Sequence, residues 1–573
     1  MSCIPYVTVQ HDFPQVFDDI AQGTVPAERV WISIYALNAP SASIHSRVLL
    51  VGGEREQDEE DTARQDGDGG GGVYVAEVKP EHQLNVGRVK EAPKNLLISS
   101  TFRPATDSIA PPSTSARHPQ QRIYLPPVLC VTPRYTLPYP SSTSALRMRK
   151  GVSANISAFD VSPSGNGLYV AGAADGRCWI GRLPGSTGSA NDASQSKPLV
   201  VLDGHVGDIT SARFFPSGEV VLTTGSDFRV CIFSALPPTE STTTPPTNLP
   251  VRTLTAHTRA PTATAILGKG RFILTGGKDG FIRCWNVGEA REVGNVPASE
   301  AVISSLFGPS IEGMILGPDP SDQEGQGGEE EQEEVFPGST PLLAVGLSSG
   351  QVVIHDLRRC TMGTTTQAAP TSNVAKPVKV QPSETIRFTL PSPTFPPGAP
   401  LDASDPAQAW IGKRPAGAVS ALNWDRSRGL LIAGYTAGLI SVHRVRDLLN
   451  SQDEPQTQDG AAPSELPTGL VAIWKRNEAS ITHIEIIPTT AEQKGADDVL
   501  RLIVTTSDGL ACRLALNTAP DPDELAVPSL ETEYVGWECG DGIAAAKWVP
   551  QREANGRSGR VVLAGAEGMV RLY

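Results

Sequence analysis

The stretch "FILTGGKDGFIRCW", Phe272 to Trp285, sets two short apolar runs on either side of the polar residues Gly-Lys-Asp-Gly. β-Branched and aromatic residues favour strands, and Asp-Gly is a frequent pair in tight hairpin turns. The stretch therefore predicts a β-hairpin with Asp279 at its turn.

The same pattern of an apolar run, small residues, a polar turn and a second apolar run occurs seven times along the chain. The copies begin at Leu168, Val220, Phe272, Leu342, Leu430, Arg501 and Val561. A further strand candidate precedes most copies, and the segment leading to the next copy supplies a fourth. Successive turn residues lie 52 to 88 residues apart, whereas a compact four-stranded propeller repeat takes roughly 40–45 residues. We expect the Pro-, Ser-, Gly- or acid-rich inserts to form loops outside the core.

Seven such units predict an all-β fold in which residues 141–573 form a seven-bladed β-propeller. The chain ends at a third strand, so an earlier segment must supply the outer strand of the last blade, and Thr143–Gly151 is placed to do so. Residues 1–140 lack the repeat. Runs such as "RVWISIYAL" predict a small β-rich N-terminal domain there, interrupted by acidic and Pro/Ser-rich inserts.

The net charge of −14 is concentrated in two short runs. Glu54–Asp68 holds eight acids against two arginines, and Glu324–Glu334 holds six acids and no base. Such runs are typical of solvated, flexible inserts. The rest of the chain is close to neutral, which argues against a nucleic-acid binder, because that class needs a basic surface. No apolar run is long enough to cross a bilayer, so we expect no membrane partner.

The sequence shows no pattern typical of a metal, cofactor or catalytic site. The eight cysteines have no C-x-x-C spacing, and the nine histidines have no H-x-x-x-H or H-E-x-x-H pattern. Gly-Lys in Ile266–Phe272 lacks the frame of a phosphate-binding loop, and no serine stands in a G-x-S-x-G elbow. We therefore expect no cofactor, no metal and no enzymatic activity.

A His and an Asp recur at a fixed spacing in two neighbouring units. His205 lies 22 residues before Asp227, and His257 lies 22 residues before Asp279. Each pair could be a catalytic base with its orienting acid, or a hydrogen bond that joins two parts of one blade. A catalytic pair has no reason to recur 52 residues later, so we interpret both pairs as structural.

These residues resemble the WD40 repeat, a family in which a His, a Ser or Thr, an Asp and a Trp are hydrogen-bonded within one blade. The third unit supplies the whole set: His257, Thr275, Asp279 and Trp285. The second unit supplies three of the four: His205, Thr223 and Asp227. Phe233 stands where that unit would carry the tryptophan, and it offers no N–H donor. The resemblance implies a blade network at these positions.

A longer resemblance rests on "RFFPSG" (Arg213–Gly218), on "GKGR" (Gly268–Arg271) after "TATAI", and on the terminal "EGMVRLY". These segments look like the proteasomal ATPase-associated factor family, WD40 chaperones of the proteasome regulatory particle. The match is strongest over residues 154–306 and continues collinearly to Tyr573. It implies a non-enzymatic assembly chaperone that binds the C-terminal domain of a base ATPase subunit. It also implies a protein of the cytoplasm and nucleus, monomeric apart from that partner.

Two rival classes stay open. One is a generic WD40 adaptor, for example a substrate receptor of a ubiquitin ligase, which would carry a ligase-docking segment outside the blades. The other is a propeller enzyme, which would need acid, base or metal-binding residues that converge on the channel.

The hairpin turns and the loops between units share one face of a propeller. Four residues expected on that face are larger or more charged than turn residues ordinarily are: Phe228, Arg259, Lys278 and Tyr435. Aromatic and arginine side chains are enriched at the centres of protein interfaces. These residues are therefore candidates for partner binding, and simple drift of loop sequence is the alternative.

Overall fold

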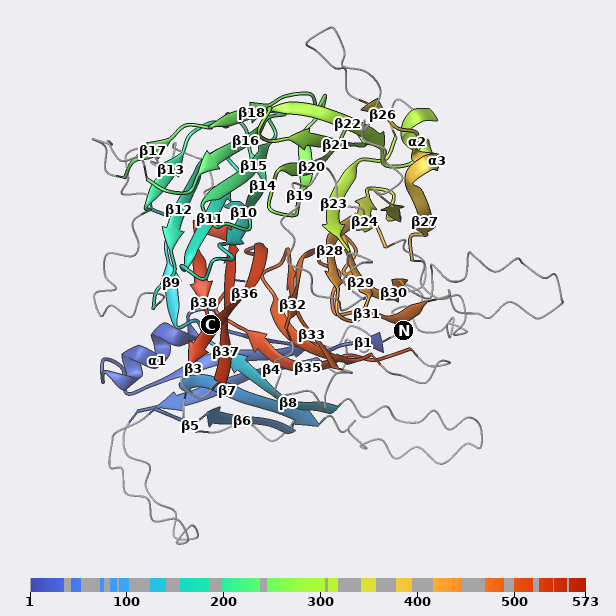
Figure 1. Ribbon diagram of the computed structural model, residues 1–573. Coiled ribbons are helices and arrows are strands. Elements are labelled where there is room, and N and C mark those ends of the chain that lie inside the picture. The colour runs from blue at the N-terminus through green and yellow to red at the C-terminus, as the bar shows by residue number, and fades with distance from the viewer. Residues whose placement is uncertain are drawn as a thin grey trace, which may run out of the picture.

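The computed structural model describes residues 2–35, 43–52, 73–76, 83–89, 92–101, 124–140, 155–185, 198–237, 245–304, 308–317, 342–356, 378–393, 416–445, 469–488, 499–518, 525–538, 540–553 and 556–573. Both acidic runs of the sequence, at 54–68 and 324–334, lie outside these residues. The described chain is mostly β-strand, arranged in the propeller-like fold of Figure 1.

Seven sheets of the described residues follow the seven repeats, and we number them in the chain order of their first strands. Sheet 1 contains β10 (Ile156–Val161), β11 (Leu168–Ala173), β12 (Cys178–Arg182), β13 (Val200–Leu202) and β17 (Thr247–Asn248). Sheet 2 contains β14 (Ile209–Phe214), β15 (Val220–Gly225), β16 (Val230–Ser234) and β18 (Arg252–Leu254). Sheet 3 contains β19 (Pro261–Leu267), β20 (Phe272–Gly277), β21 (Phe281–Asn286), β22 (Arg291–Pro297) and β26 (Val378–Lys379).

The remaining repeat sheets have the same up-and-down order. Sheet 4 contains β23 (Ile311–Leu316), β24 (Leu342–Leu347), β25 (Val352–Asp356) and β27 (Ile386–Leu390). Sheet 5 contains β28 (Val419–Asp425), β29 (Leu430–Tyr435), β30 (Leu439–Arg444), β31 (Leu470–Lys475) and β1 (Ser2–Cys3). Sheet 6 contains β32 (Ile481–Ile487), β33 (Val499–Thr506), β34 (Ala511–Asn517), β35 (Ser529–Tyr534), β8 (Tyr124–Val131), β7 (Ala92–Thr101) and β6 (Gln83–Val89). Sheet 7 contains β36 (Ile543–Glu553), β37 (Gly556–Gly565), β38 (Val570–Leu572) and β9 (Tyr135–Leu137).

The second and third strands of each repeat sheet form the antiparallel hairpin that the repeat predicts. The first strands of consecutive sheets contact one another, and β36 also contacts β10 (Figure 1). We call these seven strands, β10, β14, β19, β23, β28, β32 and β36, the inner strands.

Small residues in the second strands let neighbouring sheets pack closely. A Cβ atom added at Gly172 would lie 2.5 Å from Ile209 of the next inner strand, and one at Gly434 would lie 2.6 Å from Ile481. Gly346 has the same relation to Val419, at 2.4 Å. Contacts below 3 Å are repulsive, so glycine here leaves room for the first β-branched side chain of the following sheet.

Side-chain hydroxyls also connect consecutive inner strands. Thr210 donates to the carbonyl of Pro261 at 2.5 Å, and Thr482 donates to the carbonyl of Ile543 at 2.5 Å. Ser157 donates in the same way to Ile209, at 2.6 Å. Each bond satisfies a backbone acceptor at the point where two sheets meet. The sequence reasoning did not identify these residues. Their signal is a Ser or Thr directly after the first residue of the inner strand.

The N-terminal residues form a sheet of their own, and they also add strands to three repeat sheets. Their own sheet contains β2 (Tyr6–Val9), β3 (Ala27–Tyr35), β4 (Ile44–Val51) and β5 (Tyr74–Ala76). Helix α1 (Phe13–Ala21) connects β2 to β3. Strand β1 pairs with sheet 5, β8 with sheet 6 and β9 with sheet 7. The predicted boundary at residue 140 therefore does not separate the sheets, because edge strands take partners from either side of it.

The outer strand of sheet 7 comes from a different segment than the sequence predicts. Tyr135–Leu137 pairs antiparallel with β38, with Val570 opposite Leu137. The predicted segment, Thr143–Gly151, lies outside the described residues. An earlier segment does complete the last sheet, but it lies upstream of the one chosen from the sequence.

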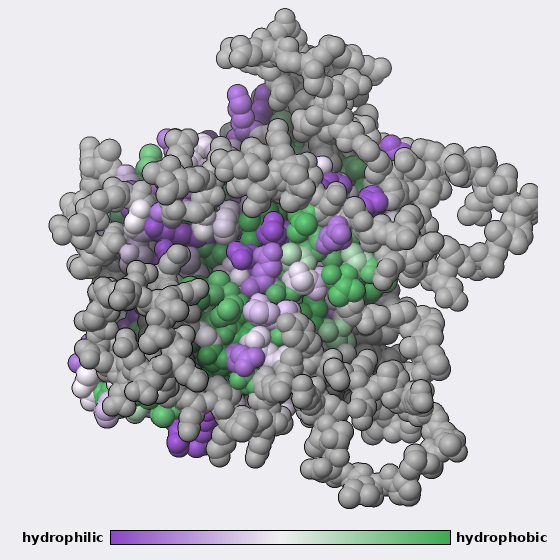
Figure 2. All heavy atoms as spheres, turned by 90° about the horizontal axis from the view of Figure 1, so that it is seen from below, coloured by the Kyte–Doolittle hydropathy of each residue, from purple (hydrophilic) through white to green (hydrophobic). Residues whose placement is uncertain are grey.

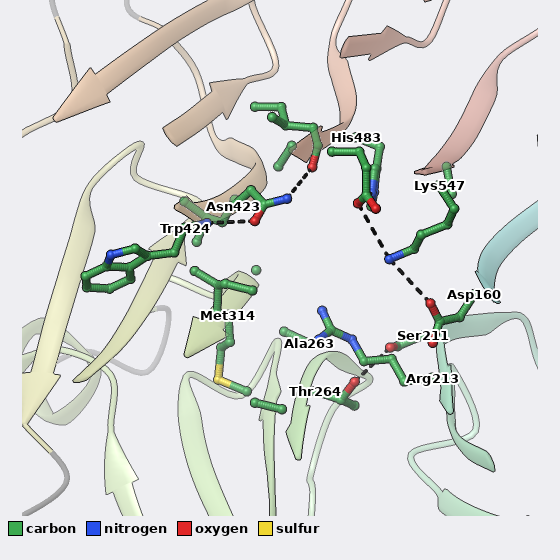
Figure 3. A pocket seen from close by; sticks show the side chains of 18 of the residues that line it. Asp160, Ser211, Arg213, Ala263, Thr264, Met314, Asn423, Trp424, His483 and Lys547 are labelled. Atoms are coloured by element: carbon green, nitrogen blue, oxygen red, sulfur yellow. Dashed lines mark hydrogen bonds and ion pairs between the residues drawn. The ribbon is translucent and has the colours of Figure 1, made fainter. Parts of the chain in front are cut away.

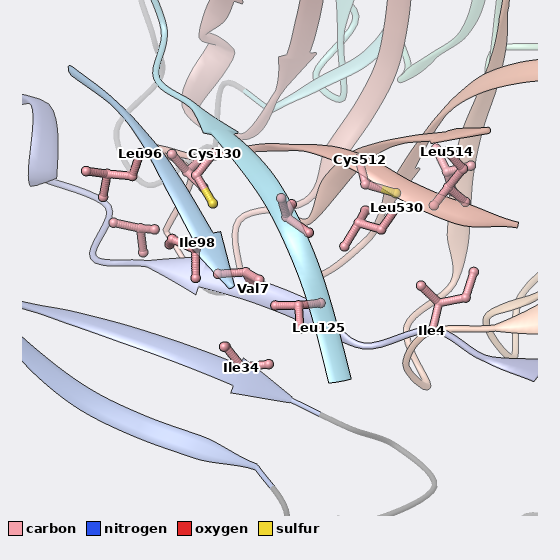
Figure 4. Close-up of a cluster of buried hydrophobic side chains, with 14 of the residues drawn as sticks. Ile4, Val7, Ile34, Leu96, Ile98, Leu125, Cys130, Cys512, Leu514 and Leu530 are labelled. Carbon is pink, nitrogen blue, oxygen red and sulfur yellow. The ribbon is translucent and has the colours of Figure 1, made fainter. Parts of the chain in front are cut away.

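One of the hydrophobic clusters among the described residues contains side chains from both parts of the chain (Figure 4). Val7, Ile34 and Ile98 from the N-terminal strands belong to the same buried cluster as Cys512 and Leu514 of β34. Because buried apolar area is the main stabilising term in folding, this shared cluster couples the N-terminal strands to sheets 5 and 6.

A buried ion pair fastens the start of the chain to this core. Arg476 and Glu533 pair with each other, and their side chains are 5% and 2% exposed. Glu533 also accepts the backbone N–H of Val7 at 3.1 Å, and Arg476 lies over the ring of Tyr6. The carboxylate therefore satisfies a charge and a backbone donor that would otherwise be buried without a partner.

The view from below Figure 1 shows a mixed surface in which hydrophobic residues gather near the centre with polar residues among them (Figure 2). Trp31 of β3 and Leu97 of β7 are 46% and 43% exposed. Arg47 lies 4.3 Å above the Trp31 ring.

The short helices α2 (Glu300–Ser304) and α3 (Pro382–Thr385) and a 3₁₀ turn at Ala566–Gly568 complete the described elements. No helix among the described residues is long and apolar enough to cross a membrane.

Candidate interaction surface

One end of the repeat sheets carries both the hairpin turns and the loops that lead into the inner strands. In sheet 2 the N–H of Ser226 donates to the carbonyl of Asp208, and in sheet 3 that of Lys278 donates to Ala260, both at 2.8 Å. The five other repeat sheets have the equivalent bond. These bonds hold turn and loop together at the same end, and we call the surface they form the turn surface.

Sheet 3 has the complete four-residue network beneath this surface. Nδ1 of His257 lies 3.0 Å from Asp279 Oδ2, and Nε2 lies 2.7 Å from Thr275 Oγ1. Trp285 donates its Nε1–H to the same Thr275 oxygen at 2.8 Å. The backbone N–H of Thr258 also donates to Asp279, at 3.1 Å.

The Asp279 carboxylate, which can only accept hydrogen bonds when ionised, sets the direction of the other bonds. Nδ1–H of His257 donates to this carboxylate. The Thr275 hydroxyl donates its hydrogen to Nε2 of His257, and its oxygen accepts from the indole of Trp285. Every polar atom of the network has a partner, and the histidine holds the loop against the turn.

Sheet 2 has the same network without the indole. His205 lies 2.9 Å from both Asp227 Oδ1 and Thr223 Oγ1, while Phe233 packs in the core. A Cβ atom at Gly204 would lie 2.8 Å from the Phe233 ring. Close packing against Phe233 therefore requires glycine at position 204, and the hydrogen bonds to Asp227 and Thr223 require histidine at position 205.

Both turn carboxylates have a pKa below its ordinary value. Burial alone would raise the pKa of Asp227 and Asp279, but hydrogen bonds from the histidines and from backbone N–H groups outweigh it. Both acids are therefore ionised at neutral pH and act as acceptors only.

Sheet 6 has a related network that the sequence reasoning missed. Asn477 donates to Asp508 Oδ2 at 2.7 Å, and Thr506 donates to the same carboxylate. Asn477 stands four residues before its inner strand, as His205 and His257 do. An amide at that spacing was the available signal.

Tyr435 is not on the turn surface, contrary to the prediction. It is 1% exposed, and its hydroxyl lies 3.4 Å from Ser441 Oγ, which in turn lies 3.1 Å from His443 Nε2. The strand pairing places Tyr435 where sheet 3 has Gly277, directly beside the His257 ring. The tyrosine therefore fills space that the network histidine occupies in sheet 3.

Phe228 is on the turn surface in an unusual conformation. Its side chain is 45% exposed and its φ is +67°. The six other repeat turns have glycine after the turn residue, at Gly176, Gly280, Gly350, Gly438, Gly509 and Gly568, each with positive φ. A side chain in this region costs about 1 kcal/mol relative to glycine. Val206, whose N–H donates to Asp227, is 81% exposed close to this turn.

Arg259 and Lys278 are exposed on the turn surface, in the loop and the turn of sheet 3. The backbone bond from Lys278 to Ala260 keeps the two segments adjacent. Arg229 follows Phe228 and is also exposed. Phe228 and Val206 thus form an apolar spot with three cationic side chains on the same two sheets.

Among the described residues, no group of three or more His, Cys, Asp and Glu side chains is placed to hold a metal ion. The cysteines on the third strands of sheets 1, 2, 3 and 6 are buried thiols, and burial raises the pKa of Cys178 and Cys512 to about 12. These thiols are packing residues at neutral pH.

The family model for the WD domain, G-beta repeat, matches residues 196–234 and 248–286. The chain is a WD40-repeat protein. The two matched segments end in the third strands of sheets 2 and 3, which are the sheets with the His-Thr-Asp network. A comparison with curated proteins finds none that matches this WD40-repeat protein. WD40 repeats indicate a protein-interaction scaffold, because the fold presents loops and turns on a stable ring of sheets.

Proposed function

We propose that this WD40-repeat protein is a non-enzymatic binding protein in which sheets 1 to 7 are the blades of one closed propeller. The contact between β36 and β10 supports closure, as does the ion pair at 3.3 Å between Lys547 of sheet 7 and Asp160 of sheet 1. A rigid ring presents a preformed surface, so little conformational entropy is lost when a partner binds.

The observation that carries the binding role is Phe228. A protein that needed only a turn at this position would have glycine there, as its six other repeats do. Exposed aromatic side chains held rigidly by the backbone are typical centres of protein interfaces. The strained, exposed Phe228 with cationic neighbours therefore supports partner binding at the turn surface.

The partner that we propose is the C-terminal domain of an ATPase subunit in the base of the proteasome regulatory particle. This proposal rests on the resemblance of "RFFPSG", "GKGR" and the terminal "EGMVRLY" to the proteasomal ATPase-associated factor family. It makes the protein an assembly chaperone of the cytoplasm and nucleus that is monomeric apart from its partner. A generic WD40 adaptor, such as a substrate receptor of a ubiquitin ligase, is the alternative.

The test is a pull-down of the full chain with each of the six recombinant ATPase C-terminal domains. We expect one domain to be retained with a Kd of about 1 μM or below. Retention of none of the six would overturn the chaperone assignment. Co-purification of a ubiquitin-ligase scaffold in its place would support the adaptor.

Phe228→Gly separates binding from folding. We expect the variant to be more stable by about 0.5–1 kcal/mol, because glycine adopts a positive φ without the steric strain that a side chain causes. We also expect at least about tenfold weaker partner binding, because an interface aromatic is lost. Urea unfolding and binding titration measure the two effects. Leu249→Ser is the matched control, because Leu249 is 70% exposed between β17 and β18 and should leave binding unchanged.

A further inference from the structure

The inner strands enclose a cavity of about 1400 Å³ along the axis of the ring. All seven inner strands contribute residues to its wall. Figure 3 shows the charged side chains of this wall on one side, from the strands β32, β36, β10 and β14. The cavity is large enough for a small organic molecule.

Most charges in this wall already have partners. Lys547 Nζ lies 3.3 Å from Asp160 Oδ1 and 3.8 Å from Glu485 Oε2. The other Asp160 oxygen accepts the backbone N–H of Phe214 at 2.9 Å, and Glu485 Oε1 accepts that of Trp548 at 3.3 Å. Both carboxylates are thus satisfied, and each one also joins its own inner strand to the next.

Arg213 is different. It occupies the same place on β14 that Asp160 and Lys547 occupy on β10 and β36, and Figure 3 shows its guanidinium directed into the cavity. Among the described residues its guanidinium has no hydrogen-bond or ion-pair partner. A guanidinium offers five N–H donors in a planar fork that suits carboxylate and phosphate oxygens.

The neighbouring cations increase the attraction for an anion. Burial lowers the pKa of His483, and the positive charges of Lys547 and Arg213 lower it further, so that this ring is neutral near pH 7. Two cations therefore share this side of the cavity, and one of them is already engaged by the two acids. On this side of the cavity, the charge left without a contacting partner among the described residues is that of Arg213.

The opposite side of the cavity is mixed: apolar residues lie there beside polar ones such as Thr264, Glu312 and Asn423. Inner strands β19 and β23 contribute Ala263, Met314 and Ile315 to the wall, and β28 contributes Leu422. Ile315 and Leu422 are only partly buried, so their side chains have apolar surface free to contact a ligand. Apolar surface within reach of a few convergent polar groups is typical of small-molecule sites.

We propose that the cavity binds a small organic anion, with its acidic group on Arg213 and its apolar body against Ile315 and Leu422. The acidic group is a carboxylate or a phosphate, since the guanidinium fork fits both. This site is independent of the turn surface, because it faces the axis of the ring, and it therefore does not depend on the identity of the protein partner.

The experiment titrates the full chain with hexanoate, hexyl phosphate and neutral hexanamide, using calorimetry and the thermal unfolding midpoint. We expect one of the two anions to bind and to raise the midpoint, because a ligand that binds the folded state stabilises it. The stronger anion identifies the acidic group. Hexanamide binding equal to that of both anions, or no binding of either anion at about 10 mM, would contradict the proposal.

Arg213→Gln tests the role of the guanidinium. We expect about tenfold or greater loss of anion affinity, because a charged hydrogen-bond donor is removed. Since Arg213 has no side-chain partner among the described residues, we expect stability without ligand to be unchanged or slightly higher. A structural arginine would instead give a loss of stability. Arg252→Gln, on the outer strand β18, should leave affinity unchanged. Arg213→Lys keeps the charge and should retain part of the binding, and undiminished affinity in Arg213→Gln would overturn the site.

Discussion

Burial of the His443 ring makes this residue one source of the protein's response to acid. The ring is 8% exposed, its Nδ1 has no partner, and burial lowers its pKa to about 4. His355 of β25 is 1% exposed, and burial likewise lowers its pKa to about 4. Both histidines stand at the third-strand position of Trp285. Each accordingly folds as a neutral aromatic in place of the tryptophan.

These two histidines predict a loss of stability between pH 6.5 and 4. In that range the unfolded histidine binds a proton and the folded one does not, so stability falls as pH falls and levels off below about 4. The loss amounts to roughly 3 kcal/mol for each ring. Urea unfolding at a series of pH values measures it.

The variant His443→Phe has the residue that sheet 2 carries at this position, Phe233. We expect it to remove about half of the pH dependence between pH 6.5 and 4 while the fold persists.

The turn acids Asp227 and Asp279 respond in a different pH range, which provides a separate check. The pKa values of Asp227 and Asp279 are lowered, so their contribution is present at neutral pH and is lost only as pH falls below about 3.8. An unchanged slope between pH 6.5 and 4 in His443→Phe would show that the ring is not the source.

At the scale of the element, the first two strands depend on contacts far away in sequence. Strand β1 has only two residues, and it pairs in parallel with β31 at the edge of sheet 5. So short a strand has little stability of its own. Its position is determined by the core around Val7 and by the buried pair of Arg476 and Glu533.

Glu533→Gln should weaken the attachment of the N-terminal residues to the core. The amide oxygen can still accept the Val7 N–H, but Arg476 is left as a buried charge without its counter-ion, so we expect a loss of about 3–5 kcal/mol in the free energy of unfolding. Protease susceptibility within residues 2–9 and urea unfolding would report it. Glu531→Gln is the matched control. Glu531 lies on the same strand but its side chain is 25% exposed, and we expect an effect below about 1 kcal/mol.

For the whole molecule, the N-terminal strands and the repeats that share their core should unfold together. The shared core contains residues from β2, β7 and β8 as well as from β33 and β34. Sheet 7 takes its outer strand from Tyr135–Leu137. Because this cluster holds N-terminal strands together with strands of sheets 5 and 6, we expect the N-terminal strands and these two sheets to unfold as one unit.

A fragment of residues 141–573 tests this coupling. It lacks β1, β8 and β9, so sheets 5, 6 and 7 would each expose an edge, and we expect aggregation or strongly reduced stability. Size-exclusion chromatography and urea unfolding measure the outcome. A soluble fragment with the stability of the full chain would show that the N-terminal strands form an independent unit.

The sequence by itself determined the hairpins, their turns and the blade networks, because these depend on residues within one repeat. Asp-Gly turns, strand-forming runs and the spacing of His257, Thr275, Asp279 and Trp285 are local signals. The Gly-to-aromatic change at Phe228 was also visible in the sequence. Its left-handed backbone followed only from the turn geometry, which all repeats share.

Only the tertiary structure decided which distant segments complete the sheets and which side chains are buried. Strands β1, β8 and β9 pair with partners more than 400 residues away, and no local pattern specifies such a pairing, since any exposed edge can accept a strand. Tyr435 was expected at the surface, and it is buried because its sheet lacks the histidine that fills the same space in sheet 3. The cavity at Arg213 has the same origin. Its wall takes residues from seven strands, and only the packing of these strands beside one another brings those residues together.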